Sequence, residues 1–410
     1  MKASVKLIVM ALAALMCLAV LPASGELSGK SSEDYEPLRE LAEAYGFKLG
    51  GCLSYDQLKN AAYLDFLATH FNSVTMTNET KAYSLLSPAS ALSKSGDPVL
   101  DFTKADKMIE WARDNGLRVR GHVLVWDAYM TDWFFRMGYS ARMPYVDSDT
   151  MRARLKRYIE MVITHFESKY PGVIYCWDVV NEAIADNGSE WVQGDPRHLR
   201  ASRSGTSNLF LDHIGPDYVE YAFLCAREVV DSLGADIKLF YNDYNMFFAD
   251  KRAAALEMLK SINTYAVGEN GEYRKLADGI GMQGYIGGYG TQSGCLSASA
   301  ISNIRDSIQA FSDLGLEVQI TEMAVRNYDP EKIDAHGAFY GNLFKMFRAA
   351  NEDAENPILT AVCIWCLTDS PNAKPGEYNY SMNSLYGGLV TEKLAVKPAF
   401  ENVYRVLKGE

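Results

Sequence analysis

Short apolar runs alternate with amphipathic stretches along most of the chain. The apolar runs are rich in β-branched and aromatic residues and end at polar residues or glycine, which is typical of buried strands. They predict strands at Phe47–Cys52, Phe71–Met76, Leu117–Val125, Val173–Val180, Ile237–Tyr241, Gly279–Gln283, Leu316–Thr321 and Leu359–Leu367. Helical periodicity lies at 37–46, Asp101–Asn115, Asp149–Tyr170, Pro216–Leu233, Lys251–Gly268, Ser297–Leu314 and Ile333–Asn351.

This alternation continues without a break in composition, a repeat or a low-complexity linker. Because parallel strands are joined through helical crossovers, eight strand-then-helix units favour one closed parallel barrel over an open sheet. The predicted fold class is therefore α/β, a single (β/α)8 TIM barrel. Glycine and proline gather at 284–294 and 369–388, which we interpret as loops on the barrel rim.

The N-terminus has the pattern of a secretory signal. Lys2 and Lys6 precede an apolar run from Leu7 to Leu21, and small residues surround a predicted cut after Gly25. We expect residues 1–25 to be a signal peptide, 26–36 a flexible lead-in and 37–410 a single domain of a secreted protein. An uncleaved anchor and a lipoprotein attached at Cys17 are the less favoured alternatives, because the run is short and Cys17 follows a bulky residue.

Net charge and cysteine content reduce the number of functional classes to which the protein could belong. The net charge is −12 and the pI about 5.1, which argues against a nucleic-acid partner. No other apolar run is long enough to cross a membrane, so none is expected once the signal is cut. The cysteines beyond the signal are expected to be structural; Cys363 and Cys366 have metal-like spacing but lack a second pair. We predict no metal and no cofactor.

Polar and aromatic groups follow nearly every predicted strand, where the active site of such a barrel lies. Glu182 ends the fourth strand and Glu322 the seventh, so the two carboxyl groups lie nearly opposite each other. A lone Glu at a strand end is more often an ion-pair partner. Two of them, with Asn181, His122 and Trp365 at neighbouring strand ends, favour cleavage of a glycosidic bond, which needs paired carboxyl groups.

Six ordered motifs make the chain resemble the family 10 glycoside hydrolases, the endo-β-1,4-xylanases of a retaining TIM-barrel clan. The similarity spans about residues 37–408, and each motif is weak alone. The motifs are Arg120–Trp126 (RGHVLVW), Trp177–Glu182 (WDVVNE), Asn242–Asn245 (NDYN), Gly279–Gln283 (GIGMQ), Ile320–Glu322 (ITE) and Lys397–Phe400 (KPAF).

The resemblance implies a role for each matching residue. Glu182 would be the acid/base, Glu322 the nucleophile, and Asn181 would hold the sugar 2-hydroxyl group. The residues expected to bind substrate on the glycone side are Asn78, Lys81, His122, Trp126 and Gln283, with Trp365 as the floor under the cleaved sugar. Retention implies about 5–5.5 Å between the carboxyl groups, and burial should raise the pKa of Glu182. The implied partner is xylan or a xylo-oligosaccharide, bound by a monomer.

The chain departs from the family beside the nucleophile. Tyr285 stands where the family usually has a His, and Ala324 where it has the Asp that orients that His. We interpret these as one coupled change, because a His needs a partner on its far nitrogen while a neutral Tyr hydroxyl can donate alone. The hypothesis is that Tyr285 contacts the substrate and also keeps Glu322 ionised and oriented.

Other departures fall on substrate contacts. Thr77 replaces a Glu, Ala82 a Trp and Asp127 a His, and the second Trp expected after the eighth strand is missing. A lighter lid, or one supplied by another aromatic residue, is expected; the candidates are Trp133, Phe134, Tyr378 and Tyr380. Asp243 is expected to be an ion-pair partner rather than a catalytic group.

Three functions remain open. An endo-1,4-β-xylanase is favoured, because both Glu residues and Asn181 are present. Another β-glycanase of the same clan would differ in whether its glycone pocket accepts a C5 substituent. A xylan-binding protein with lost or weak turnover is kept open by the substitutions at Thr77, Ala82, Asp127, Tyr285 and Ala324.

Overall fold

A computed structural model describes residues 29–287, 297–352, 357–371 and 386–410. Eight parallel strands close into a barrel in the order β1-β10-β9-β8-β7-β4-β3-β2. The strands are β1 (Lys48–Leu53), β2 (Ser73–Met76), β3 (Arg118–Gly121), β4 (Ile174–Asn181), β7 (Lys238–Asp243), β8 (Gly279–Ile286), β9 (Glu317–Val325) and β10 (Leu359–Ile364). The predicted (β/α)8 barrel is confirmed.

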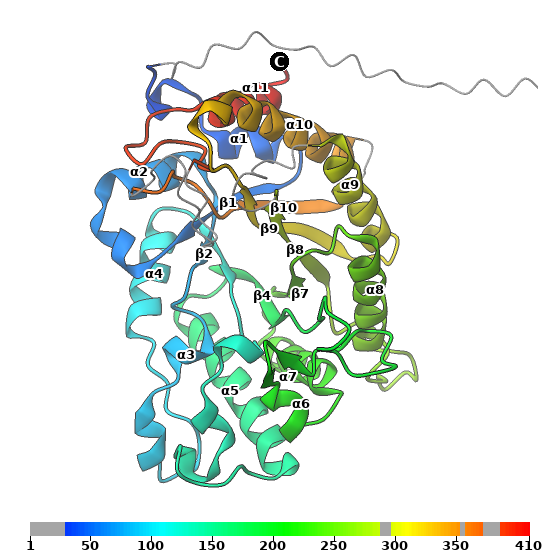
Figure 1. The fold of residues 1–410 in the computed structure, drawn as a ribbon. Helices are drawn as coiled ribbons and strands as arrows, with labels where there is room; N and C mark the ends of the chain where they lie inside the picture. Colours follow the sequence, from blue (N-terminus) through cyan, green and yellow to red (C-terminus); the bar gives the residue numbers. More distant parts are fainter. Residues whose placement is uncertain (1–28, 288–296, 353–356, 372–385) are drawn as a thin grey trace, which may run out of the picture.

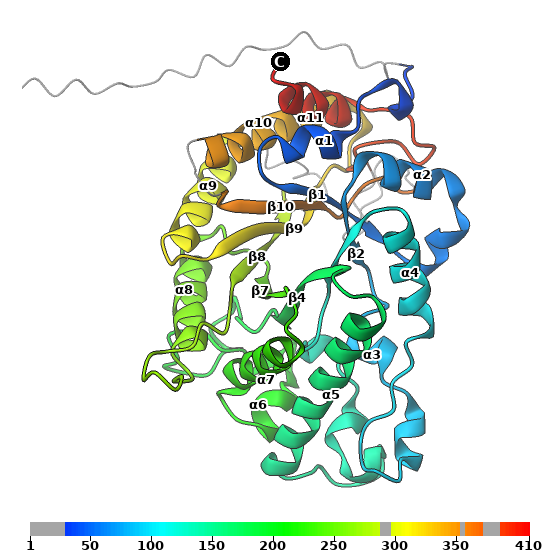
Figure 2. The same ribbon diagram turned by 180° about the vertical axis from the view of Figure 1, so that it is seen from behind.

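Helices surround this barrel on its outer side (Figure 1 and, from behind, Figure 2). They are α1 (Leu38–Glu43), α2 (Ala61–His70), α3 (Ala82–Leu85), α4 (Thr103–Asp114), α5 (Ser148–Lys169), α6 (Leu209–His213), α7 (Tyr218–Leu233), α8 (Ala249–Asn263), α9 (Ala298–Ser312), α10 (Ile333–Glu352) and α11 (Pro398–Lys408). Every predicted helix is present. The helices α2, α3, α6 and α11 were not predicted, although Pro398 at the first turn and Gly409 after the last turn of α11 are ordinary helix-boundary residues.

The strand bounds differ from the prediction at the rim. β8 continues to Ile286, so the rim loop predicted from 284 begins later, and most of both predicted rim loops lies outside the described residues. β3 ends at Gly121, although Val125 still bridges to Val180 of β4. Val125 is fully buried, so its apolar character reflects burial and not regular strand pairing.

Close packing explains two residues of the barrel wall. Trp177 of β4 is fully buried and packs against Phe166 of α5, with ring centroids 6.0 Å apart. Gly121 of β3 lies against the same indole, where a Cβ atom would come within 2.4 Å of the ring. Glycine at this position therefore lets β3 approach the Trp177 side chain.

The first and last described helices, α1 and α11, pack together at one side of the barrel. α11 lies beside α1 in both ribbon views. Residues 26–36 were predicted to be a flexible lead-in; the structure describes this segment from residue 29 onward. Ser31 bridges to Ala395, and Tyr35 packs edge-on against Phe400 and Tyr404. The segment is mostly polar, so the packing of its aromatic residue Tyr35 could not be predicted from the sequence pattern. The predicted signal peptide lies outside the described residues.

The described cysteines fit the structural role predicted for them. Cys52, Cys176, Cys225, Cys363 and Cys366 are buried, while Cys295 lies outside the described residues. Within the described ranges, no helix combines the length and the apolar character that a membrane span requires.

Candidate active site

The two predicted carboxyl groups project from the carboxyl ends of β4 and β9. Glu182 directly follows β4, and its backbone nitrogen donates to the Asn242 carbonyl oxygen of the neighbouring strand at 2.9 Å. Its backbone is left-handed, with φ of 55°. Such a conformation costs free energy for a residue with a side chain and often marks a functional site. The Glu182 side chain therefore points away from the strand axis, at the rim of the barrel.

Glu322 is positioned by a bulge in β9. Against β8, Gln283 pairs with Thr321 and Tyr285 with Ala324, so β9 has one extra residue at this point. The same surplus occurs on the other side, against β10. Glu322 has φ of 53°, and its side chain is almost fully buried. A bulge re-aims one side chain without ending the strand, which turns Glu322 toward the site.

Amide side chains connect the two carboxyl groups. The Gln283 amide nitrogen donates to both Glu182 Oε1 and Asn181 Oδ1 at 3.1 Å. The Asn242 amide nitrogen donates to Asn181 Oδ1 at 2.9 Å and to Glu322 Oε1 at 3.1 Å. Thr321 donates to Asn242 Oδ1 and fixes that amide. The Asn181 amide nitrogen is buried and lacks a hydrogen-bond partner within the described part of the chain.

A buried ion pair supports His122 beneath Glu322. Arg120 contacts both carboxylate oxygens of Asp178, with the Nη2–Oδ1 contact at 2.6 Å. Asp178 Oδ2 lies 2.8 Å from His122 Nδ1, and His122 Nε2 lies 4.0 Å from Glu322 Oε1. Burial would raise the pKa of Asp178, but Arg120 and His122 lower it below the ordinary range. His122 is thus held by a carboxylate on the side away from Glu322.

The hydrogen bond predicted between Tyr285 and Glu322 is present. The Tyr285 hydroxyl donates to Glu322 Oε2 at 2.6 Å. Burial and the Glu322 charge raise the pKa of Tyr285 far above its usual value, so this hydroxyl stays a donor. Ala324 pairs with Tyr285 across β8 and β9, and its small side chain leaves room for the ring. The geometry supports the interpretation of these two residues as one coupled change.

Glu182 has a different environment from Glu322. Burial raises its pKa to about 7, and the Asp243 and Glu322 charges act in the same direction. Arg203 and the Gln283 hydrogen bond oppose them. Arg203 Nη1 donates to Glu182 Oε2 at 3.0 Å, while the same guanidinium group binds Asp127. A carboxyl group with a pKa near neutrality can donate a proton in one step and accept one in the next.

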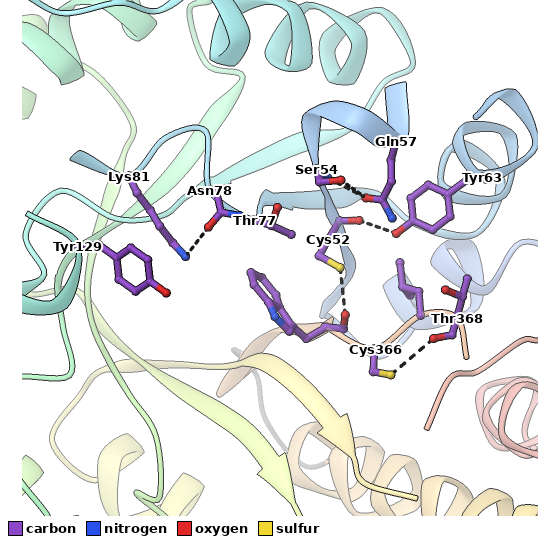
Figure 3. A pocket seen from close by; sticks show the side chains of 12 residues that line it. Cys52, Ser54, Gln57, Tyr63, Thr77, Asn78, Lys81, Tyr129, Cys366 and Thr368 are labelled. Carbon is purple, nitrogen blue, oxygen red and sulfur yellow. Dashed lines mark hydrogen bonds between the residues drawn. The ribbon is translucent and has the colours of Figure 1, made fainter. Parts of the chain in front are cut away.

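A cavity of about 380 Å³ lies beside these groups (Figure 3). Lys81 and Tyr129 lie on one side of it and Ser54, Gln57 and Tyr63 on the other. The lining residues are Cys52, Ser54, Gln57, Tyr63, Thr77, Asn78, Lys81, Tyr129, Trp365, Cys366, Leu367 and Thr368. Hydroxyl, amide, ammonium and aromatic groups together suit a sugar, which presents both hydroxyl groups and apolar ring faces.

Lys81 connects this cavity to the carboxyl groups. Its ammonium group donates to Asn78 Oδ1 at 3.2 Å and lies 5.0 Å from the Trp126 ring and 4.7 Å from the Tyr129 ring. Burial lowers the pKa of Lys81, while Glu322 and Glu182 raise it in part. Trp126 lies behind Tyr129, and its ring nitrogen is buried without a partner among the described residues.

The predicted site residues therefore converge from six barrel strands and their following loops. Asn78, Lys81 and Trp365 line the cavity; Asn181, Gln283, Tyr285 and His122 surround the carboxyl groups. One lid candidate is wrong, because Phe134 is fully buried against Phe135 and Tyr158. Tyr378 and Tyr380 lie outside the described residues. The exposed aromatic group at the cavity is instead Tyr129.

Asp243 has the ion-pair role predicted for it. It lies 3.0 Å from the Lys251 ammonium group and accepts hydrogen bonds from Tyr241 and the Ile184 backbone. Asp127, predicted to alter a substrate contact, is bound to Arg203. Arg203 and the bridging role of Asn242 were missed by sequence reasoning. The dipeptide Ser204-Gly205 after Arg203 is a turn signal that could have predicted the hairpin, but not the partner of Arg203.

The described residues contain no cluster of three or more His, Cys, Asp or Glu side chains suited to a metal ion. The site is instead a pair of carboxyl groups with a cavity that offers polar and aromatic groups. On a closed β/α barrel, this combination defines a glycoside hydrolase that uses two carboxyl groups.

Comparison with known proteins agrees with this class. The profile of glycosyl hydrolase family 10 matches residues 37–406. The chain belongs to this family.

Named relatives include xylanases and one exoglucanase. Endo-1,4-beta-xylanase A of Thermotoga maritima is 36% identical over 71% of this chain and 23% of its own length. Beta-1,4-xylanase of Dictyoglomus thermophilum is 30% identical over 81% of this chain and 80% of its own length. Exoglucanase XynX of Acetivibrio thermocellus is 30% identical over 92% and 30%. The chain thus spans most of one relative and less than a third of the other two.

Solved structures share the fold. The xylanase 10B modules of Clostridium thermocellum, complexed with xylohexaose, superpose with a TM-score of 0.75 at 24% identity, covering 91% of this chain and 68% of that chain. The intracellular xylanase TsXylA of Thermoanaerobacterium saccharolyticum gives a TM-score of 0.68 at 29% identity, covering 90% and 98%.

Proposed function

We propose that this protein is an endo-1,4-β-xylanase that hydrolyses internal xylosidic bonds with retention of anomeric configuration. Family membership and the names of several relatives support the activity. The observation that carries the mechanism is the contrast between the two carboxyl groups. Burial raises the pKa of Glu182 to about 7, whereas both Glu322 carboxylate oxygens accept hydrogen bonds, from Asn242 and Tyr285, which hold them in one orientation.

In the first step, the Glu322 carboxylate forms a bond to the anomeric carbon as the bond to the leaving oxygen breaks. Glu182 gives its proton to that oxygen, so the leaving chain departs as a neutral alcohol. In the second step, water attacks the anomeric carbon, its proton passes to Glu182, and the ester bond to Glu322 breaks. Both residues return to their starting protonation states.

The surrounding groups suit a sugar held between these carboxyl groups. The amide nitrogen of Asn181, which has no hydrogen-bond partner among the described residues, is available to a sugar hydroxyl beside Glu322. Lys81 and Asn78 offer donors and acceptors on the cavity wall, and Trp365 offers an aromatic face. The proposed substrate contacts are Asn78, Lys81, His122, Trp126, Asn181, Gln283, Tyr285 and Trp365. Their removal should raise KM or lower kcat/KM without unfolding the barrel.

The direct test measures reducing sugars released from xylan, mixed-linkage β-glucan and cellulose by the wild-type protein. Xylan should be the preferred polymer, and oligosaccharide products should show internal cleavage. The Glu322→Ala variant should release none. Release from no polymer, with binding to xylan retained, would mean that the protein is a binding module and would overturn the proposal.

A separate test assigns the two roles. With an aryl xylobioside whose leaving group needs no protonation, Glu182→Ala should still form the glycosyl-enzyme, while Glu322→Ala should not. Added azide should then accelerate Glu182→Ala by replacing water, giving a glycosyl azide of retained configuration. If azide instead accelerated only Glu322→Ala and gave the azide of retained configuration, Glu322 would be the acid/base and Glu182 the nucleophile.

A β-glucanase is the second candidate, because one relative is named an exoglucanase. A glucose unit carries a hydroxymethyl group at C5 that xylose lacks. Whether the cavity has room for this group therefore distinguishes a β-glucanase from a xylanase. Faster cleavage of β-glucan or cellulose than of xylan in the same assay would favour this candidate.

We propose further that the mature protein is a secreted monomer comprising residues 26–410, with the catalytic barrel beginning near residue 37. The charged start, apolar run and small residues of 1–25 support this proposal. N-terminal sequencing of the protein from the culture medium should begin at Glu26. Recovery of an uncut chain from cells alone would contradict it, and TsXylA is an example of a relative described as intracellular.

A further inference from the structure

A small hairpin places Arg203 against Glu182. β5 (Ser202–Arg203) and β6 (Thr206–Ser207) pair antiparallel, with Arg203 opposite Thr206. The two turn residues Ser204 and Gly205 have φ of 50° and 80°, as a type I′ turn requires. The Ser204 backbone nitrogen donates to Glu190 Oε1 at 2.8 Å, which fixes the turn to its own loop. Arg203 therefore projects from a constrained backbone.

Asp127 holds the guanidinium group in one orientation. Arg203 Nε donates to Asp127 Oδ2 at 3.1 Å, and Nη2 donates to Oδ1 at 2.9 Å. This two-point contact leaves Nη1 for Glu182 Oε2, at 3.0 Å. The side chains of Asp127 and Glu182 are only 8% and 10% exposed. Bidentate contacts of this kind fix direction as well as charge.

We propose that Arg203, clamped by Asp127, is a positioning residue that orients the Glu182 carboxyl group and balances its protonated and ionised forms. This inference rests on the proposed role of Glu182 as acid/base. Asp127 stands where the family usually has a His, so the clamp belongs to this chain.

The groups that face Glu182 favour its protonated form unless a positive charge opposes them. From β7 and β9, Asp243 and Glu322 add negative charge, and burial also favours the protonated form. Among the described residues, Arg203 is the positively charged group that forms an ion pair with Glu182. The other charged or titratable groups around Glu182 are Lys81 at the start of α3, Tyr285 of β8, Asp127, Arg200 and Tyr244. Arg200 donates to the Glu182 carbonyl oxygen and to the Tyr244 hydroxyl group.

Each half of the reaction needs one of the two forms. In the first step Glu182 loses its proton to the leaving oxygen, and the charge that remains on it lies 3.0 Å from Arg203. In the second step the ionised form must take a proton from water. An unopposed cation would deprotonate Glu182 too early for the first step, and Asp127 offsets this. Without Arg203, Glu182 would stay protonated and be a poor base.

The experiment measures kcat/KM against pH with an aryl xylobioside that has a poor leaving group. Arg203→Met should move the alkaline limb to higher pH by about one unit, because an adjacent opposite charge shifts a carboxyl pKa by roughly 1–3 units. Asp127→Asn keeps the shape and an acceptor oxygen but removes the charge, so the limb should move to lower pH. Arg203→Lys should lie between Arg203→Met and wild type.

A matched control is Arg157→Met. Arg157 also pairs with two carboxylates, Asp97 and Glu160, but lies on the outer helix α5. This variant should leave the profile unchanged. A substrate with a good leaving group adds a second readout: kcat then reports the second step, and Arg203→Met should lower it about 3- to 10-fold near pH 6, because a one-unit shift removes up to about nine-tenths of the ionised form.

The outcomes separate the inference from the proposed function. A wild-type protein without activity on xylan and on both aryl xylobiosides would overturn both. Normal wild-type activity with an unmoved alkaline limb in Arg203→Met, or a limb that moves the same way in Asp127→Asn, would overturn the inference alone. If Arg203→Met does not fold, Asp127→Asn and Arg203→Lys decide: a downward shift in Asp127→Asn supports the clamp, and no shift refutes it.

Discussion

Replacing Tyr285 by Phe removes one hydroxyl group that donates to Glu322 Oε2 at 2.6 Å. Both side chains are buried, at 8% and 5% exposure, so water cannot substitute for the lost donor without rearrangement. A hydrogen bond to a charged group contributes about 1.5–3 kcal/mol. At about 1.4 kcal/mol per tenfold change in rate, the variant should lose about 10- to 100-fold in kcat/KM.

The pH profile should change in a defined direction. Because the Tyr285 hydroxyl donates to a Glu322 carboxylate oxygen, its loss should move the acid limb of kcat/KM toward neutrality, measured with an aryl xylobioside from about pH 4 to pH 9. Tyr158→Phe is the matched control, because the Tyr158 hydroxyl is buried and has no partner within the described residues. Unchanged kcat/KM together with an unmoved acid limb would refute the reasoning.

The coupled change at Tyr285 and Ala324 gives a stricter version of this test. Tyr285→His alone should be poorly active, because Ala324 cannot fix the tautomer of the new imidazole. Adding Ala324→Asp should restore activity at least several-fold over the single variant, as interacting neighbours do not behave additively. A double variant no better than Tyr285→His would show that the two positions are not coupled.

Four further predictions concern the site and the barrel that supports it. In wild type, kcat/KM should fall as the pH rises through about 7, because burial raises the pKa of Glu182 to that value and the protonated form is the acid; a flat profile from pH 6 to 9 would contradict this. Asp178→Asn leaves Arg120 buried without its counter-charge and should cost about 3–5 kcal/mol in the free energy of unfolding by urea. Asp178 also contributes stability at neutral pH that is lost as the pH falls below about 4, since its pKa is lowered on folding. Gly121→Ala should destabilise the barrel by about 1–3 kcal/mol in the same assay, because its Cβ would meet the Trp177 ring at 2.4 Å.

The residues around Glu322, the proposed nucleophile, give a physical reason why this chain can have His122 but not the second His that the family usually has. His122 is braced by Asp178 and, through it, by Arg120, all fully buried in the barrel. On its other side, Glu322 accepts a hydrogen bond from the neutral Tyr285 hydroxyl group, and the described residues show no charged chain behind that group. The two sides of Glu322 are thus supported by different chemistry, one through a charge network and one through a hydroxyl group.

The sequence determined the barrel and its two carboxyl groups. Apolar runs of strand length alternating with amphipathic helices can bury their surfaces as a closed parallel sheet covered by helices, and strand ends then deliver Glu182 and Glu322 to one rim. These are local properties of pattern and order. The resemblance to family 10, which usually has a His at this position beside the nucleophile, led to the prediction that Tyr285 lies beside Glu322.

Only the tertiary structure decided how those groups are held. The bulge at Glu322 depends on the register with both neighbouring strands, which strand patterns do not encode. Phe134 was a plausible lid by composition but is core by packing. Arg203 lies 21 residues from Glu182 and 76 from Asp127 along the chain, yet contacts both. Side chains on separate loops meet only after the barrel has closed, because closure alone fixes the distances between strand ends.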